Sequence, residues 1–163
     1  ILAEFPANKV VLDPFGECKG STVIACMYKV PDAGNSYILY GLYDSSSGRE
    51  LVPCSRKEGY PINEERFVLK DTCLIGPEYD DFAAIYDKNG NVVCDGGKYQ
   101  DIDFTYGSSY GIGFAISPTD TYYNVINTDG KAVGGKYDSI DKDADGNFVC
   151  KKGDQTETIK SAK

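Results

Sequence analysis

The chain has 163 residues, with 25 acidic and 17 basic side chains, no histidine and a formal charge of −8. This length favours one domain with a core of its own, and no apolar run approaches the roughly 20 residues of a membrane-spanning helix. Nucleic acids are bound through clustered Lys and Arg, and no basic run is longer than the Lys151-Lys152 pair. The composition therefore argues against a nucleic-acid partner and against membrane insertion.

Glycine and aromatic residues dominate the rest of the composition, with 18 Gly, 13 Tyr and 7 Phe and no Trp. A composition of this kind favours many short strands joined by tight turns, so we expect an all-β fold. The chain begins at Ile1 and not at Met. Either a leader has been removed or the sequence is a piece of a longer chain, and we favour a cleaved secretory leader, which would place the protein outside the cell or on its surface.

A hairpin pattern recurs four times along the chain. It consists of two apolar or Tyr residues, an Asp or Asn, a short polar spacer and a Gly. The copies are 11–16, 42–48, 85–90 and 125–130. The Asp or Asn side chain can bond to the backbone of the turn, and Gly supplies a positive φ at little cost. The spacing of the copies is roughly forty residues, which is typical of a repeat protein.

Two further elements accompany these hairpins. Short apolar strands precede them at 24–26, 67–69, 114–116 and 148–150, and their first and third residues share one face. We expect that face to form the core. The segment 96–103, which begins Gly-Gly-Lys-Tyr, recurs with few changes as 134–141.

These elements divide the single domain 1–163 into units of approximately 21–62, 63–104 and 105–143, with 1–20 joined to 144–163. The first hairpin has no strand before it and the last strand has no marked hairpin after it, so the two ends could complete one unit. Pairing them would close a propeller-like or barrel-like ring of about four units without an exposed sheet edge. An open stack of β-hairpins and a trefoil-like barrel are the alternatives.

One copy resembles a known bacterial repeat. The residues concerned are Tyr40-Gly41-Leu42-Tyr43-Asp44, followed by Gly48 and Leu51-Val52. They are similar to the core of the WG (KWG) repeat, and Tyr137-Asp138-Ser139-Ile140 resembles its opening. The resemblance extends over about residues 21–160 in degenerate copies, with Ala83-Ala84 and Tyr123-Asn124 in place of the aromatic-Gly pair.

The resemblance implies a bacterial source and a non-catalytic binding or structural module, and it supplies no catalytic residue. Protein–protein interaction is the first functional hypothesis, with a protein or a cell-surface polymer as the partner. Carbohydrate or cell-wall recognition is the alternative, and an exposed aromatic platform lined by Asp or Asn would favour it. A glycosidase is a third reading, which would need two carboxylates in one cleft.

The absence of histidine removes Ser-His-Asp and Cys-His mechanisms and His-ligated zinc. It also weakens the G-x-S-x-G match at 107–111, because that motif needs a base and a strand-turn-helix context. We therefore expect no enzymatic activity and no resident cofactor. The six cysteines form no C-x-x-C pair. Cys26 and Cys150 fill apolar strand positions and are read as core residues, with a bridge from Cys18 to a C-terminal cysteine conceivable in a closed ring.

Two sets of residues are candidate sites. Alternating Asp141, Asp143, Asp145 and Asn147 match the start of a calcium loop. Lys152 stands where that loop needs a bidentate Glu, so calcium is a weak hypothesis beside a solvated acidic turn. A tyrosine cluster is the second set, and it is read as a ligand-binding surface or as packing on the sheet. It consists of Tyr106, Tyr110, Tyr122 and Tyr123.

Overall fold

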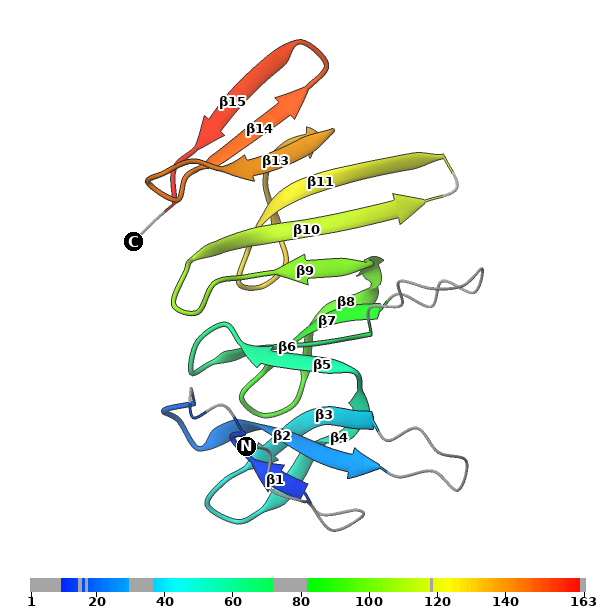
Figure 1. The fold of residues 1–163 in the computed structure, drawn as a ribbon, viewed down its shortest axis with the longest axis vertical. Helices are drawn as coiled ribbons and strands as arrows, with labels where there is room; N and C mark the ends of the chain where they lie inside the picture. Colours follow the sequence, from blue (N-terminus) through cyan, green and yellow to red (C-terminus); the bar gives the residue numbers. More distant parts are fainter. Residues whose placement is uncertain are drawn as a thin grey trace.

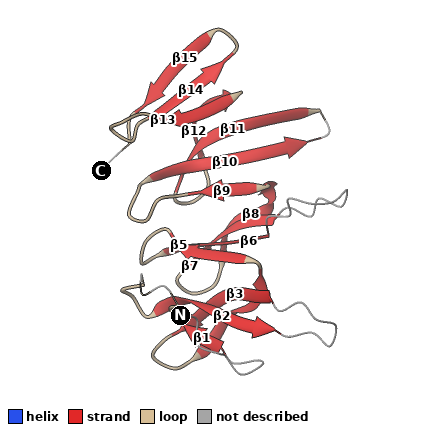
Figure 2. Ribbon diagram, in the orientation of Figure 1, coloured by secondary structure: helices blue, strands red, loops and turns tan. Residues whose placement is uncertain are grey.

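The computed structural model describes residues 10–14, 16, 18–29, 37–71, 82–117 and 119–161. These residues form fifteen strands and no helix, which confirms the all-β class (Figure 2). No helix in the described ranges is long and apolar enough to cross a membrane.

The strands pair in four antiparallel sheets that follow one another along the chain. The first contains β1 (Val10–Leu12), β2 (Thr22–Lys29), β3 (Tyr37–Asp44) and β4 (Arg49–Arg56). The second contains β5 (Glu58–Pro61), β6 (Arg66–Asp71), β7 (Phe82–Asp87) and β8 (Val92–Tyr99). The third contains β9 (Asp101–Asp103), β10 (Tyr110–Ser117), β11 (Asp120–Asn127) and β12 (Ala132–Tyr137). The fourth contains β13 (Ser139–Lys142), β14 (Phe148–Lys152) and β15 (Gln155–Ile159).

The four sheets lie one above the next along the long axis, with the first and the fourth at opposite ends (Figure 1). β1 pairs with β2 in the first sheet, whereas β14 pairs with β13 and β15 in the fourth. The joined unit of 1–20 with 144–163 is therefore not formed by the described residues. Nor do these residues form a closed barrel or propeller, so the expected ring closure is not confirmed.

Apolar side chains fill the space between successive sheets. Ile24 and Leu42 of the first sheet meet Phe67, Leu69 and Ala84 of the second. A larger cluster joins the second and third sheets, and a third cluster joins the third sheet to Phe148 and Cys150 of the fourth. The second and third sheets are thus buried on both faces. The expectation of one core face per strand underestimated this burial.

The strand register corrects two of the four predicted core triplets. Ile24, Val68, Ile112 and Val149 occupy equivalent positions, because they pair with Leu42, Ile85, Val125 and Thr158 in the four sheets. The predicted triplets at 67–69 and 148–150 are centred on this position. The first triplet is displaced by one residue, and the third is Gly111-Ile112-Gly113 in place of 114–116. Because two of its three residues are glycines, the sequence shows no apolar triplet there.

A β-bulge recurs where the third and fourth strands of a sheet pair. The register shifts opposite Gly41, Ala84 and Asn124 in the first three sheets. A Cβ on Gly41 would lie 2.4 Å from the Val52 carbonyl oxygen, so the bulged strand approaches too closely for a side chain there. At Asn124 the side chain is kept, and its amide donates to the Gly135 carbonyl at 2.7 Å.

Candidate functional site

The predicted calcium loop is the hairpin turn between β13 and β14. One carboxylate oxygen of Asp143 accepts hydrogen bonds from the backbone N–H groups of Asp145 and Asn147, both at 2.9 Å. The other oxygen accepts from the Asn147 side-chain amide at 3.0 Å. These bonds, led by the one from the Asn147 side chain, lower the pKa of Asp143. The Asp143 oxygens therefore stabilise the turn.

The same turn occurs in two other sheets. Asp87 accepts from the backbone of Asn89 and Asn91 between β7 and β8, at 2.8 and 2.9 Å. Between β11 and β12, the side-chain oxygen of Asn127 accepts hydrogen bonds from the backbone N–H groups of Asp129 and Lys131. A neutral amide oxygen thus does in one turn what a carboxylate does in the others. The role of Asp143 in the turn therefore accounts for a carboxylate at this position without a bound cation.

No group of three or more His, Cys, Asp or Glu within the described ranges is arranged to hold a metal ion. Asp141 lies in β13 and is exposed, as are Asp143 and Asp145. The calcium hypothesis therefore gains no support from the geometry. The acidic loop has the same turn structure as the predicted hairpins. It differs in position, because it connects the first two strands of its sheet.

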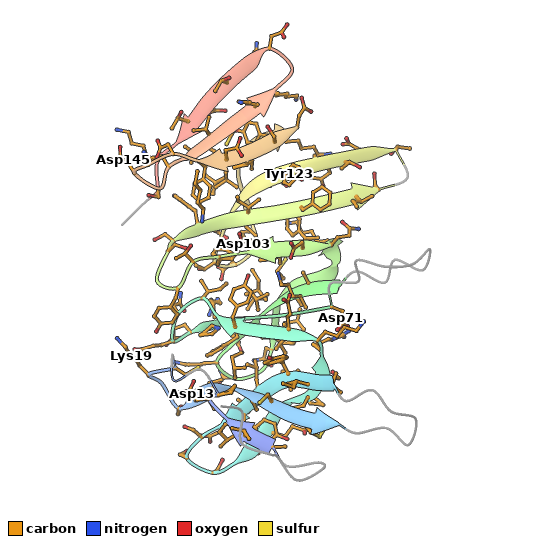
Figure 3. The ribbon with its side chains drawn as sticks, in the orientation of Figure 1. Asp13, Lys19, Asp71, Asp103, Tyr123 and Asp145 are labelled. Atoms are coloured by element: carbon orange, nitrogen blue, oxygen red, sulfur yellow. The ribbon has the colours of Figure 1, made fainter. Side chains whose placement is uncertain are left out.

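The four predicted tyrosines separate into two groups on different sides of the stack. Tyr106 is 40% exposed in the turn between β9 and β10, and Tyr110 begins β10. Tyr122 and Tyr123 are consecutive in β11 and point to opposite faces of the sheet. Figure 3 shows Tyr123 far from Asp145, which lies near the turn that carries Tyr106. The four side chains form no single aromatic platform.

Tyr110 borders a hollow of about 230 Å³ between the third and fourth sheets, whereas Tyr106 is not among the residues that line it. Its walls come from the β9–β10 loop, the β13–β14 turn and the end of the described chain. They consist of Thr105, Ser108, Tyr110, Lys142, Asp145, Gly146, Phe148 and Ser161. Tyr110 and Asp145 were predicted as members of two unrelated sites, and the structure brings them to one place. Lys142 and Ser161 carried no signal in the sequence.

Some polar groups of this hollow are bonded and some are not. The Lys142 ammonium donates to the Thr105 hydroxyl at 3.3 Å, and the Ser108 hydroxyl donates to the Thr105 carbonyl at 2.6 Å. The phenol of Tyr110, the carboxylate of Asp145 and the hydroxyl of Ser161 make no hydrogen bond to another described residue. These three groups are therefore available to a ligand.

The second tyrosine group lies on an arm formed by β10 and β11. β9 pairs with β10 only as far as Phe114, and β12 pairs with β11 only as far as Tyr123, so the strands beyond pair with each other alone. Phe114 and Tyr123 stack with ring centroids 4.6 Å apart. Ile116, on the same face, is 44% exposed. The arm therefore presents a small apolar patch, and Figure 1 shows it projecting beyond its neighbours.

Tyr122 does not contribute to that patch. Its ring lies on the opposite face, where the Lys136 ammonium sits 4.1 Å from the ring centroid. Lys136 also pairs with Asp120 at 3.3 Å. This side chain therefore packs against its own sheet, as the packing interpretation of the tyrosines predicts.

A second hollow, of about 190 Å³, lies where Tyr40, Glu58 and Lys70 meet between the first two sheets. Its polar groups are already used. The Lys70 ammonium pairs with Asp101 at 2.8 Å and with Glu58 at 3.4 Å. The Tyr60 phenol, whose pKa is raised by burial, donates to the Ile102 carbonyl at 2.6 Å. This hollow is a structural junction between sheets.

The described cysteines are free thiols. Cys26 and Cys150 are buried, as expected of core residues, and burial raises the pKa of both. Cys18 packs beside the cluster between the first two sheets, whereas Cys150 belongs to the cluster between the last two. A bridge between them is therefore excluded. Cys73 lies outside the described residues.

No family model, no curated protein and no solved structure matches this chain.

Proposed function

We propose that this chain is a non-catalytic interaction module of a bacterial protein, built as an open stack of degenerate WG repeats. The recurrence of one turn at Asp87 and Asn127, at the same place in two successive sheets, supports the repeat origin, as does the bulge opposite Gly41 and Ala84. Stacked repeats create extended surfaces that such proteins use for binding. Protein–protein interaction is the function that these features favour.

The apolar patch of the β10–β11 arm is the observation that carries this proposal. Phe114, Ile116 and Tyr123 form one partly exposed surface on a projecting two-stranded ribbon. Aromatic and aliphatic anchors of this type dominate the binding energy of protein interfaces. The formal charge of −8 favours a partner with a basic surface, because opposite charge speeds encounter and selects the partner.

The use of the carboxylates supports a non-catalytic role. Asp87 and Asp143 hold turns, and Asp71, Asp101 and Asp129 are paired with basic side chains. A glycosidase needs two carboxylates facing each other across a substrate cleft. None of the side chains just named is free for that task.

The test compares three purified chains: the wild type, Ile116→Asp and Val92→Asp. Val92 is also an exposed apolar strand residue, 57% exposed in β8, and it provides the matched control. Each chain is first checked for an unchanged melting temperature and then used to capture proteins from a bacterial extract. Any protein that depends on Ile116 is purified and titrated by calorimetry.

We expect a partner that binds the wild type and Val92→Asp alike, and Ile116→Asp at least about tenfold more weakly. Equal binding of one purified partner to all three chains would show that the interface does not lie on the arm. If no captured protein distinguishes the variants, the interaction function through this patch is wrong.

Carbohydrate recognition remains the second candidate, because the hollow between the third and fourth sheets combines Tyr110 with free polar groups. The aromatic platform that would favour it over a protein partner is not formed by the four tyrosines. It therefore ranks below protein interaction as the function of the whole module.

A further inference from the structure

We propose that the hollow between the third and fourth sheets is a binding site for one pyranose sugar ring. The site is separate from the β10–β11 arm, and it does not depend on the interaction function proposed above. It rests on the size of the hollow, on the free polar groups that converge on it and on the rigidity of the two segments that form it.

The size of the hollow limits what can bind. Its volume is about 230 Å³, below the roughly 300–1,000 Å³ of sites for drug-sized ligands. A single six-membered sugar ring is of the right size, whereas a nucleotide or a folded peptide is too large. The lining is mainly apolar, with a few polar groups at defined places, which is the usual composition of a small-molecule site.

The polar groups match a polyhydroxy ligand. Asp145 offers two acceptor oxygens, while Tyr110 and Ser161 offer hydroxyl groups that can donate or accept. None of the three is engaged with another described residue. A sugar presents neighbouring hydroxyls that each donate and accept, so one ring can satisfy all three groups. The ring of Tyr110 supplies the apolar wall against which the C–H face of a sugar can lie.

The charges of the lining offset each other. The Asp145 carboxylate is unpaired, and the Lys142 ammonium keeps its positive charge, because it donates only to the neutral Thr105 hydroxyl and lies 5.6 Å from the Phe148 ring centroid. A sugar carboxylate would meet both charges, so the repulsion from Asp145 would be offset by Lys142. A neutral sugar can use both groups as well, because its hydroxyls donate to Asp145 and accept from Lys142.

Both segments that form the hollow are held by bonds that do not involve the proposed ligand-binding groups. The β13–β14 turn is fixed through Asp143, and Asp145 contributes only its backbone N–H to it. The opposite loop is fixed by the Gly107 N–H, which donates to the Ile62 carbonyl at 2.8 Å. Because the walls are already ordered, binding a ligand does not cost the entropy of ordering a loop.

The experiment is a titration of the ¹⁵N-labelled chain followed by two-dimensional NMR. The probes are the methyl glycosides of glucose, galactose and N-acetylglucosamine, with glucuronate as the anionic probe and free alanine as the zwitterion. The variants are Asp145→Ala and Asn89→Ala. Asn89 holds the equivalent position in the β7–β8 turn, and its backbone N–H makes the same bond to Asp87, so it is the matched control.

We expect at least one neutral glycoside to shift amide signals of 105–110, 142–148 and 161 and to saturate in the millimolar range. Asp145→Ala should weaken that binding about fivefold or more, in line with the loss of one hydrogen bond to a charged group of about 1 kcal/mol or more. Asn89→Ala should leave it unchanged, and glucuronate, whose carboxylate meets both Asp145 and Lys142, should gain no affinity over the neutral probes.

Several outcomes would overturn the proposal. Absence of shifts with every neutral glycoside, or shifts spread over all four sheets, would remove the site. Saturation by alanine with no response to the glycosides would reassign the hollow to a zwitterion. Equal affinity in Asp145→Ala and the wild type would show that the free carboxylate takes no part. None of these results depends on whether the arm binds a protein.

Discussion

At two successive interfaces of the stack, tyrosines at equivalent positions bind different partners. Between the second and third sheets, the Tyr99 ring covers Gly113, and its hydroxyl donates to Asn124 at 3.1 Å. Between the third and fourth sheets, the Tyr137 hydroxyl donates to the Glu157 carboxylate at 2.7 Å. Tyr99 and Tyr137 are the last residues of the two Gly-Gly-Lys-Tyr segments, so the motif supplies a bridge from each sheet to the next.

The type of residue that accepts the tyrosine hydrogen bond depends on how exposed that residue is to solvent. Asn124 is 5% exposed and stays neutral, whereas Glu157 lies in an exposed strand of the last sheet. A buried carboxylate would carry a large desolvation cost, and an amide fills the same position without it. A repeated motif can thus keep its geometry while its partner changes with depth in the stack.

The largest expected effect comes from the tight fit at the first of these interfaces. A Cβ on Gly113 would lie 2.7 Å from a Tyr99 ring carbon. Gly113→Ala should therefore lower the free energy of unfolding by about 1–3 kcal/mol, through overpacking. Urea unfolding measures the change.

Gly135→Ala is the control for that substitution, because nothing lies within 4 Å of an added Cβ at Gly135. It should change the free energy of unfolding by less than about 0.5 kcal/mol. If Gly113→Ala were as stable as this control, the Tyr99 ring would have room to move and the interface would be looser than described.

A smaller effect should separate the two tyrosine bridges. Tyr99→Phe leaves the buried Asn124 oxygen without its partner and should cost about 1–3 kcal/mol. Tyr137→Phe should cost less than about 1 kcal/mol, because water can replace the lost bond to the exposed Glu157. Thermal melts of both variants test the order. Equal losses would mean that solvent does not reach Glu157.

An effect of similar size is expected at alkaline pH from Cys150, which is 1% exposed at the third interface. Burial raises the pKa of this thiol from 9.0 to about 11. Below pH 9 both states keep the proton and stability is complete. Between pH 9 and 11 only the unfolded state loses it, so stability falls as the pH rises, by about 2 kcal/mol.

Unfolding in urea at pH 8, 9, 10 and 11 measures this loss for the wild type and for Cys150→Ala. The variant should show a shallower decline, because one of the ionising groups is gone. Parallel curves for the two chains would assign the alkaline loss to other groups, such as Cys54 and Tyr99, whose pKa values burial also raises.

Much of the local structure was predictable from particular residues. The hairpins at Asp44, Asp87 and Asn127 form at the predicted places, because an Asx side chain followed by Gly encodes its own turn. The triplets at 67–69 and 148–150 also match the register. The triplet in β10 was misplaced, since the space beside Gly111 and Gly113 is taken by the ring of Phe104, in the β9–β10 loop, and by the ring of Tyr99, at the end of β8.

The candidate hollow was only half predictable. Tyr110 and Asp145 were identified separately, from tyrosine clustering and from an acidic pattern. Their proximity depends on how the third sheet packs on the fourth. Lys142 and Ser161 gave no local signal, because an isolated Lys or Ser acquires a role only from its neighbours in space.

The sequence by itself determined the all-β class, the turn positions and the repetition of the Gly-Gly-Lys-Tyr segment. These features follow from short-range chemistry: side-chain to backbone bonds, glycine conformations and apolar alternation. Only the tertiary structure decided that the four sheets lie one above the next, that the middle sheets are buried on both faces and that Tyr110 and Asp145 line one hollow. Each of these depends on contacts between sheets, where the space left by a glycine in one strand is filled by a ring from another.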